Sequence, residues 1–427
     1  MPQYPQFIEK NIGETKLFLT PLERNSTAMQ LSFDVGSFME EKNNAGISHL
    51  LEHILGNGSK KYPTQKLIAE AVKKYGGHFN AFTSVTETGF WIYTPASAIN
   101  ETLDILFDIV FNPIALFKNS EIEKEKRIII QEIKMHKDEP DWQIAEFANQ
   151  TLNPNHKIAI PIAGFEKTVA KINQETLANW WKKYYLPSNL KIAIAGFIPK
   201  NLENKIEQFI PISNKKIEIN LPEYSAIRNL RIAVHPKQLD QVKLILAFEQ
   251  GGKITPKEMI TAELLSYILG SRMGSLLTEE LRVKEALCYD VWADTDNFND
   301  FNIFYIGGGF SGDKITKATQ KIIDVLNKIK NNKIPNEKFE EAKSNYLGNL
   351  EMKCDDTAGL PSWPLFDFKQ FGRVLGFKET IKILNSINKN EVDNLVEKLF
   401  FSKNAAVTTL GPYKDDNKIK EILEKLN

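Results

Sequence analysis

The 427-residue sequence predicts an α+β protein made of two homologous αβ domains from an internal duplication, each a mostly antiparallel sheet packed with helices. Three observations predict this fold. Short segments recur at an offset close to half of the chain length, and the strand-like and helix-like segments follow the same order in both halves. Strands also do not alternate strictly with helices, which argues against a doubly wound parallel sheet. The length suits two domains of about 200 residues.

The repeat consists of three pairs of segments that match at offsets of 214 or 215 residues, in one order. In each half a strand-like run ends in glycine, an apolar helical segment follows, and an apolar strand running into glycine comes near the end. The pairs are Phe33–Gly36 with Phe248–Gly251, Leu50–Gly56 with Leu264–Gly270, and Lys191–Gly196 with Ala406–Gly411. Chance similarity of short apolar runs would not keep one period, so duplication is the better explanation.

Each half is expected to start with strands and continue with helices, a β-rich stretch, a long run of helices, a last strand and a closing helix. The expected first strands are Leu17–Thr20, Met29–Val35, Arg231–Val234 and Val242–Phe248. Pro211–Glu223 contains Pro, Ser, Asn and Lys with little apolar periodicity, which is typical of a linker. We therefore expect an N-terminal domain at 1–215 and a C-terminal domain at 222–427.

The charge balance excludes several classes of partner. Lys and Arg total 54 and Asp and Glu total 54, so the formal net charge is zero, and no nucleic-acid partner is expected.

The most apolar stretch, 105–117, is interrupted by Asp108, Asn112 and Pro113, so we expect no membrane span. The start of the chain does not resemble a signal peptide, and two cysteines cannot form a disulfide framework. We expect a cytoplasmic protein.

The segment Ile47–Leu55 is the first candidate for chemistry. Its apolar residues recur at helical spacing, which leaves His49, Glu52 and His53 together on the opposite face. Two histidines one turn apart can reach one metal ion. Catalytic zinc uses three protein ligands and keeps one position for water, whose proton a nearby carboxylate can take. His-x-x-Glu-His supplies two ligands and a base, as the inverted form of a known zinc protease motif.

The alternative is a solvated helix face that happens to carry two histidines and a glutamate. In the second half the equivalent positions hold Glu263, Ser266 and Tyr267. Because the repeated fold forms without the trio there, the trio is not needed for folding, which favours a functional role.

The third metal ligand is expected on another helix. Ser120-x-x-Glu123 has the pattern of a capping box, and Glu121–His136 follows as an amphipathic helix. Glu125, Glu132 and His136 lie on or near one face of it, and spacing alone allows any of the three to bind metal. An ordinary surface helix is the alternative for each of them.

The chain resembles the insulinase/pitrilysin family of zinc peptidases, which includes mitochondrial processing peptidase. The resemblance covers nearly the whole chain. Its motifs are Gly46-Ile-Ser-His-Leu-Leu-Glu-His53, Gly76-Gly-His-Phe-Asn-Ala-Phe-Thr-Ser84, Glu125-Lys-Arg-Ile-Ile-Ile-Gln-Glu132 and Leu281-Arg-Val-Lys-Glu-Ala-Leu-Cys-Tyr289. The first and third motifs together are highly specific, and the others are weak alone.

The resemblance implies a role for each residue of the metal site. His49, His53 and Glu132 would bind one zinc ion per chain, and Glu52 would be the general base. Glu125 matches a second acidic position of the family and would support the site from behind the ligands. His136 stands where relatives often have Tyr, so the resemblance does not assign it to the metal.

The resemblance also implies residues that handle substrate. Arg282 and Tyr289 match an Arg/Tyr pair that binds the substrate backbone and polarises the scissile carbonyl. Without the family match, Arg282 would be read as a surface charge and Tyr289 as a strand residue near the core. Asn80–Ser84 resembles the edge strand on which these peptidases lay out a peptide, with Asn80 and Ala81 binding it. An ordinary half-buried strand is the alternative there.

The family fold uses four αβ domains around a chamber, and this chain supplies two. The expected working unit is therefore a homodimer in which the zinc helix of one subunit meets Arg282 and Tyr289 of the other; a heterodimer with a related chain is the alternative. The function expected is a zinc-dependent endopeptidase that hydrolyses peptides or unfolded polypeptide segments. The rivals are a non-catalytic peptide-binding or scaffold subunit of a processing-peptidase-like complex, and a peptide-binding module with a structural zinc ion.

Overall fold

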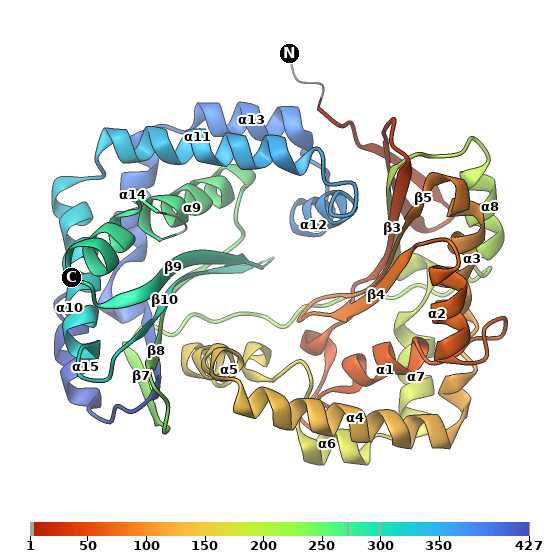
Figure 1. Ribbon diagram of the computed structural model, residues 1–427, viewed down its shortest axis with the longest axis horizontal. Helices are drawn as coiled ribbons and strands as arrows, with labels where there is room; N and C mark the ends of the chain where they lie inside the picture. The colour runs from red at the N-terminus through yellow and green to blue at the C-terminus, as the bar shows by residue number, and fades with distance from the viewer. Residues whose placement is uncertain (1–3, 271–272, 299, 427) are drawn as a thin grey trace. The chain divides into compact units, whose positions relative to one another are not determined.

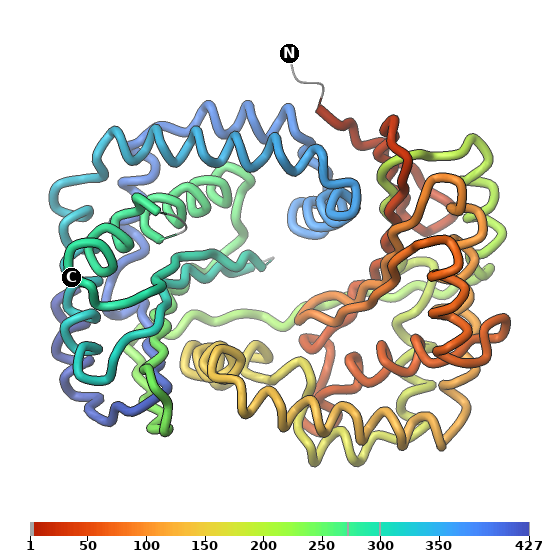
Figure 2. The backbone as a smooth tube through the Cα atoms, in the orientation of Figure 1, coloured from red at the N-terminus to blue at the C-terminus, as the bar shows by residue number. Residues whose placement is uncertain are grey.

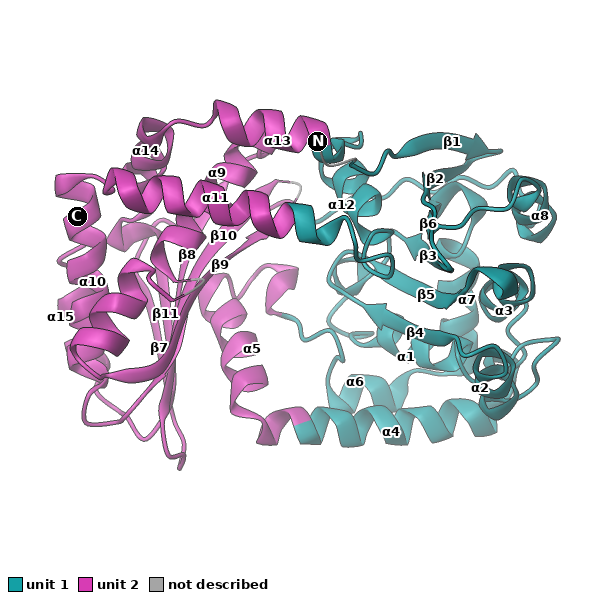
Figure 3. Cartoon of the chain, turned by 45° about the horizontal axis from the view of Figure 1, so that its top comes forward, with its two compact units in different colours: residues 1–135, 160–222, 351–377 teal, residues 136–159, 223–350, 378–427 magenta. Residues whose placement is uncertain are grey.

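The computed structural model describes residues 4–270, 273–298 and 300–426, and the chain divides into two compact units (Figure 3). Unit 1 comprises Met1–Met135, Ile160–Pro222 and Glu351–Phe377. Unit 2 comprises His136–Ala159, Glu223–Leu350 and Lys378–Asn427. Each unit is thus built mainly from one half of the chain and takes one short segment from the other half.

Unit 1 contains a six-stranded sheet in the order β1-β2-β6-β3-β5-β4 (Figure 3), of which Figure 1 labels β3, β5 and β4. Only the neighbours β2 and β6 are parallel, and every other pair is antiparallel. The strands are β1 (Ile8–Ile12), β2 (Thr15–Pro21), β3 (Ser26–Phe33), β4 (His78–Thr83), β5 (Thr88–Pro95) and β6 (Leu190–Gly196). The hairpin partner β4 therefore lies at one edge of the sheet.

The helices of unit 1 cover both faces of this sheet. They are α1 (Ile47–Leu55), α2 (Gln65–Lys73), α3 (Ile99–Phe111), α4 (Asn119–Asp138, whose last three residues fall in unit 2), α6 (Glu166–Lys171), α7 (Gln174–Tyr184), α8 (Leu202–Phe209) and α12 (Ser362–Phe371). Strand side chains alternate between the faces. Leu17 and Leu19 pack in the core that includes α1 and α3, whereas Phe18 packs against Leu365 of α12.

Unit 2 contains a five-stranded sheet in the order β7-β11-β8-β10-β9. Its strands are β7 (Arg231–Pro236), β8 (Val242–Gly251), β9 (Cys288–Asn297), β10 (Phe301–Phe310) and β11 (Ala405–Gly411). The order and directions repeat those of β2-β6-β3-β5-β4, including the single parallel pair, β7 with β11. The sheets confirm the predicted α+β fold with two homologous αβ domains.

The helices of unit 2 include one from the first half of the sequence. They are α5 (Pro140–Leu152), α9 (Pro256–Leu269), the π-helix η6 (Thr278–Lys284), α10 (Ile315–Asn332), α11 (Asn336–Lys353, whose last three residues fall in unit 1), α13 (Gly376–Ser386, whose first two residues fall in unit 1), α14 (Lys389–Leu399) and α15 (Asp416–Leu423). Ile144 and Ala148 of α5 pack on Ile245 and Leu410 of the sheet. The first half thus gives α5 to unit 2, just as the second half gives α12 to unit 1.

The expected elements agree with the structure at most positions. The helix predicted at Ile47–Leu55 has these bounds, and the helix expected at Glu121–His136 is α4. Ser120 lies inside α4 instead of capping it, because the helix begins at Asn119. The segment 210–230, which contains the expected linker, forms neither helix nor strand (Figure 2). Among the helices described, none has the length and apolar character needed to cross a bilayer.

Candidate active site

Helix α1 carries the histidine pair, and its start is fixed by a buried carboxylate. Glu40 is fully buried, and its two oxygens accept hydrogen bonds from the backbone N–H groups of Gly46 (2.7 Å) and Ser48 (2.8 Å). A negative charge is stabilising at a helix N-terminus because the first N–H groups have no partner within the helix. Gly46 has φ of 93°, and a Cβ there would lie 2.6 Å from the Ala163 carbonyl oxygen, so only glycine fits.

The apolar stripe of α1 determines which way its polar residues face. Leu50, Leu51 and Ile54 are fully buried in the unit 1 core, so His49 and His53 lie on the other side, half-buried. Their ring centroids are 4.7 Å apart with an interplanar angle of 76°. The one-turn spacing therefore brings the two imidazoles together, as expected.

Helix α4 adds a carboxylate to this pair. A ligand atom from each of His49, His53 and Glu132 lies within 4.8 Å of the other two, and Oε2 of Glu132 is 3.8 Å from Nε2 of His53. Two imidazole nitrogens and one carboxylate oxygen form a donor set typical of catalytic zinc, which leaves a fourth position for water. These three residues fit the expected ion.

Glu125 is not one of the three candidate ligands, but it contacts one of them, His53. Its Oε2 is 3.2 Å from Nδ1 of His53, and its side chain is 5% exposed. Burial alone would raise the pKa of the Glu125 carboxyl, but hydrogen bonds with His53 and Asn57 and the charge of Lys124 bring it below its ordinary value. An ionised Glu125 can only accept, so it holds the proton of His53 on Nδ1 and leaves Nε2 to bind metal.

Glu52 is held by a residue from the sheet. The hydroxyl of Thr83, at the end of β4, donates a hydrogen bond of 2.7 Å to Oε2 of Glu52. Burial raises the pKa of the Glu52 carboxyl, and the Thr83 hydrogen bond opposes that shift. A carboxylate with a raised pKa is a stronger proton acceptor, which suits a general base.

Asn80 and Ala81 lie on β4, the edge strand next to this site. Ala81 faces Phe90 of β5 in the register, and its backbone N–H is 2.9 Å from Oδ1 of Asn80. The side of β4 away from β5 has no partner strand among the described residues. An edge of this kind can pair with an extended peptide.

Arg282 and Tyr289 form a pair in unit 2. Arg282 lies in the π-helix η6, and its guanidinium carbon is 4.8 Å from the ring centroid of Tyr289 on the edge strand β9. Tyr289 is 78% exposed. This exposure argues against the alternative in which Tyr289 is a strand residue near the core. The pair is open to solvent and can meet a ligand.

The remaining candidate on α4, His136, contacts a different residue. Its ring stacks on Trp142 with centroids 4.3 Å apart and an interplanar angle of 7°. It is absent from the set of ligand atoms that converge on His53, whereas Glu132 is in that set. Spacing alone allowed Glu125, Glu132 and His136 to bind metal equally well. In the structure only Glu132 of these three belongs to the candidate metal-binding group.

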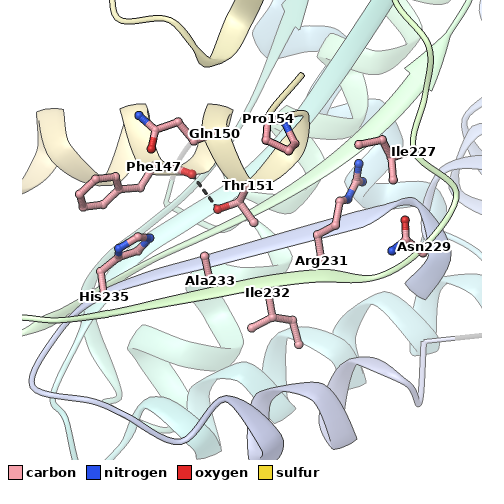
Figure 4. A pocket seen from close by; sticks show the side chains of 10 residues that line it. All are labelled: Phe147, Gln150, Thr151, Pro154, Ile227, Asn229, Arg231, Ile232, Ala233 and His235. Atoms are coloured by element: carbon pink, nitrogen blue, oxygen red, sulfur yellow. Dashed lines mark hydrogen bonds between the residues drawn. The ribbon is translucent and has the colours of Figure 1, made fainter. Parts of the chain in front are cut away.

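Unit 2 also has a hollow of about 500 Å³ between α5 and β7 (Figure 4). His235 stacks on Phe147 at one end of it, with centroids 3.9 Å apart. Arg231 lines it as well, and its Nη1 is 2.9 Å from Oε1 of the buried Glu249. None of the predicted site residues lines this hollow.

Two residues of the site had no signal in the sequence. Glu40 caps α1 across a loop, and Thr83 reaches Glu52 from a strand 31 positions later. Thr83 belongs to the quoted Gly76–Ser84 motif, but nothing in the motif indicates a contact with Glu52. Only the tertiary structure reveals either role.

Comparisons with known proteins agree with this geometry. The family model described as "Insulinase (Peptidase family M16)" matches residues 20–165, and "Peptidase M16 inactive domain" matches residues 171–346. An "Uncharacterized zinc protease" of Rickettsia felis is 30% identical over 399 residues, which are 92% of this chain and 95% of that protein. The "Probable mitochondrial-processing peptidase subunit beta" of Arabidopsis thaliana is 22% identical over 92% of this chain and 76% of its own length.

A solved structure supports the fold independently. "A protease from Helicobacter pylori" aligns with a TM-score of 0.87 at 18% identity, over 96% of this chain and 100% of that one. The match called inactive falls mostly on the second half, where the trio is replaced by Glu263, Ser266 and Tyr267. Sequence, fold and site together show that the chain belongs to the insulinase family, peptidase family M16.

Proposed function

We propose that this protein is a zinc-dependent endopeptidase that hydrolyses peptides or unfolded polypeptide segments. The observation that carries the proposal is the convergence of His49, His53 and Glu132 within 4.8 Å, with the carboxylate of Glu52 on the same helix face. A structural zinc site is usually closed by four protein ligands, whereas three ligands and an adjacent base are typical of hydrolytic sites.

The residues of the chain have separate roles in this proposal. His49, His53 and Glu132 would hold one zinc ion, which would supply Lewis acidity and lower the pKa of the attacking water. Glu52 would accept a proton from the attacking water and return it to the leaving amine. Glu125 orients His53 from behind through the 3.2 Å contact with Nδ1.

Substrate would bind in extended form along β4. The outer side of this edge strand offers backbone groups to a peptide, and pairing of backbones gives affinity that depends little on side chains. Asn80 and Ala81 lie in this strand, at the level of Trp91 and Phe90 in the neighbouring β5. Such binding favours unfolded substrates, because a folded segment already uses its backbone hydrogen bonds.

We further propose that the enzyme works as a homodimer. Arg282 and Tyr289 belong to unit 2, and the metal ligands belong to unit 1. In the family architecture that the sequence resembles, a second pair of domains completes the chamber, so Arg282 and Tyr289 of one subunit would serve the zinc site of the other. There they would bind the peptide backbone and stabilise the charge that develops on the carbonyl oxygen.

The cysteines are relevant to where the protein acts. Cys288 and Cys354 are free thiols, and burial is the main cause that raises the pKa of each to about 11. Neither is therefore a reactive thiolate at neutral pH. Free thiols are compatible with a reducing compartment, and we propose the cytoplasm.

The proposal is tested with purified protein and a library of unstructured peptides, read by mass spectrometry with and without a chelator. Cleavage that the chelator abolishes and added zinc restores is expected. Glu52→Gln is the matched control, because it keeps the metal ligands and removes the base. Zinc binding without any hydrolysis would overturn the proposal in favour of a peptide-binding module with a structural ion, and cleavage by Glu52→Gln would overturn the role of the base.

A further inference from the structure

The contact between Thr83 and Glu52 joins two elements that are far apart in the sequence. Glu52 lies on α1, and Thr83 is the last residue of β4, yet Thr83 Oγ1 is 2.7 Å from Glu52 Oε2. The distance is ordinary for a hydrogen bond that a hydroxyl donates to a carboxylate oxygen.

This hydrogen bond restricts the motion of the carboxylate. A glutamate side chain has three rotatable torsions, and holding it in one arrangement costs conformational entropy. Thr83 is β-branched and therefore stiff about χ1, so its hydroxyl is a well-placed donor. With Oε2 engaged by Thr83, Oε1 is the oxygen left to accept a proton from water.

The strand end that carries Thr83 is itself anchored. The backbone N–H of Ser84 donates to the carbonyl oxygen of Glu87 (2.7 Å), which closes the β4–β5 turn. The N–H of Phe38 donates to the carbonyl oxygen of Val85 (2.8 Å). A Cβ on Gly36 would lie only 2.2 Å from the Ser84 carbonyl oxygen, so the turn sits tightly against the segment after β3.

The Glu87 side chain secures the same turn on the other face of the sheet. One of its carboxylate oxygens accepts hydrogen bonds from Ser32 (2.7 Å) and Gln30 (3.2 Å) of β3. The other is 3.5 Å from Nζ of Lys369 on α12, and both side chains of this ion pair are 15% exposed. The turn is thus bound to β3 and to a helix from the second half of the sequence.

We propose that Thr83 is a positioning residue that holds the base Glu52 in its working orientation, with the anchored β4–β5 turn as its support. This inference rests on the proposed role of Glu52. Thr83 itself acts only through Glu52. Because it lies on the strand proposed to bind substrate, the test must separate an effect on the base from an effect on peptide binding.

The test uses Thr83→Val, which keeps the shape and removes the hydroxyl, and Thr83→Ser, which keeps the hydroxyl. Thr83→Val is expected to lower kcat by about 10- to 100-fold, the range for a displaced catalytic group. KM and bound zinc should stay unchanged, and Thr83→Ser should restore most of kcat. A raised KM with unchanged kcat, or a serine variant as slow as the valine variant, would overturn the proposal.

A further measurement makes the test independent of the proposed peptidase. Crystal structures of the zinc-loaded wild-type and Thr83→Val proteins should show the Glu52 carboxylate in one orientation in the former and displaced in the latter. An unmoved Glu52 would overturn the inference even if no substrate is ever cleaved, whereas an inactive wild type with a displaced Glu52 would overturn only the proposed function.

Discussion

The carboxylate of Glu125 lies 3.2 Å from Nδ1 of His53, while Nε2 of the same ring is 3.8 Å from Glu132. The two nitrogens of one imidazole therefore face two carboxylates from the same helix, α4. Glu125 is almost fully buried and Glu132 is half-buried. The buried carboxylate fixes the ring, and the more open one remains available to a metal ion.

Replacing Glu125 by Gln should weaken zinc binding by about 10- to 100-fold, the usual effect of losing a partner behind a histidine ligand. The amide is neutral, so it no longer favours a proton on Nδ1 as strongly. Zinc affinity is measured by competition with a chromophoric chelator. Glu123→Gln is the control, since Glu123 lies on the same helix and its side chain pairs with Lys126 at 2.8 Å. Equal affinities in all three proteins would show that Glu125 does not support the site.

Glu132 and Glu52 should respond differently to the same substitution. Glu132→Gln removes a proposed ligand and should lower zinc affinity by at least about tenfold, because the amide is a poorer donor than the carboxylate. Glu52→Gln should keep one zinc ion per chain. Metal content after dialysis, measured by elemental analysis, distinguishes the two variants. Full zinc content in Glu132→Gln would mean that the third ligand is another residue.

Local patterns in the sequence predicted the parts of the site that local geometry controls. The helix at Ile47–Leu55 and the approach of His49 to His53 follow from helical periodicity alone. The choice among Glu125, Glu132 and His136 could not follow from spacing, because it depends on how α4 packs in the folded chain. It came from the family resemblance, and the structure adds that Glu125 contacts His53 Nδ1 and that His136 stacks on Trp142.

The sheets were predictable in the same sense, and the exchange of segments was not. The duplication predicted two similar domains, and the two sheets share one strand order. The apolar periodicity of a helix predicts which face is buried but not what that face packs against. It therefore could not predict that α5 packs in unit 2 or that α12 packs in unit 1. The domain boundary expected between 215 and 222 stays a prediction. Thr83 and Glu40 were missed for the same reason, since each acts through a contact between different elements.

The proposed homodimer predicts that two inactive chains can complement each other. Glu52→Gln lacks the base and Arg282→Ala lacks the group that would bind the substrate carbonyl, so each homodimer should be inactive. A mixed dimer should have one site with an intact Glu52 and an intact Arg282, and should regain about half of the wild-type activity. The two chains are co-expressed with different tags, and the mixed dimer is isolated by successive affinity steps before assay. Absence of recovery in a verified mixed dimer would contradict sites shared between subunits.

The helix that crosses into unit 1, α12, carries a buried carboxyl that should make stability depend on pH. Asp367 is 3% exposed, and its Oδ2 accepts hydrogen bonds from Trp363 Nε1 and from the N–H of Leu375, both at 2.9 Å. Burial raises the pKa of Asp367 to about 6, although these hydrogen bonds oppose the shift. The folded protein therefore binds this proton more tightly than the unfolded chain, whose aspartate pKa is about 3.9.

The stability that comes from protonated Asp367 is fully present below pH about 4 and is lost as the pH rises through about 6. A shift of about two units corresponds to about 3 kcal/mol at most. Asp367→Asn keeps an oxygen acceptor without the charge, so its free energy of unfolding should exceed that of the wild type at pH 8, with a difference that shrinks toward pH 4. Denaturant titrations between pH 4 and 8 measure this difference. Asp355→Asn in the same unit is the control. The side chain of Asp355 is 84% exposed, so this substitution should change the free energy of unfolding little at any pH. A difference for Asp367→Asn that does not vary with pH would mean that Asp367 ionises in the folded protein as it does in water.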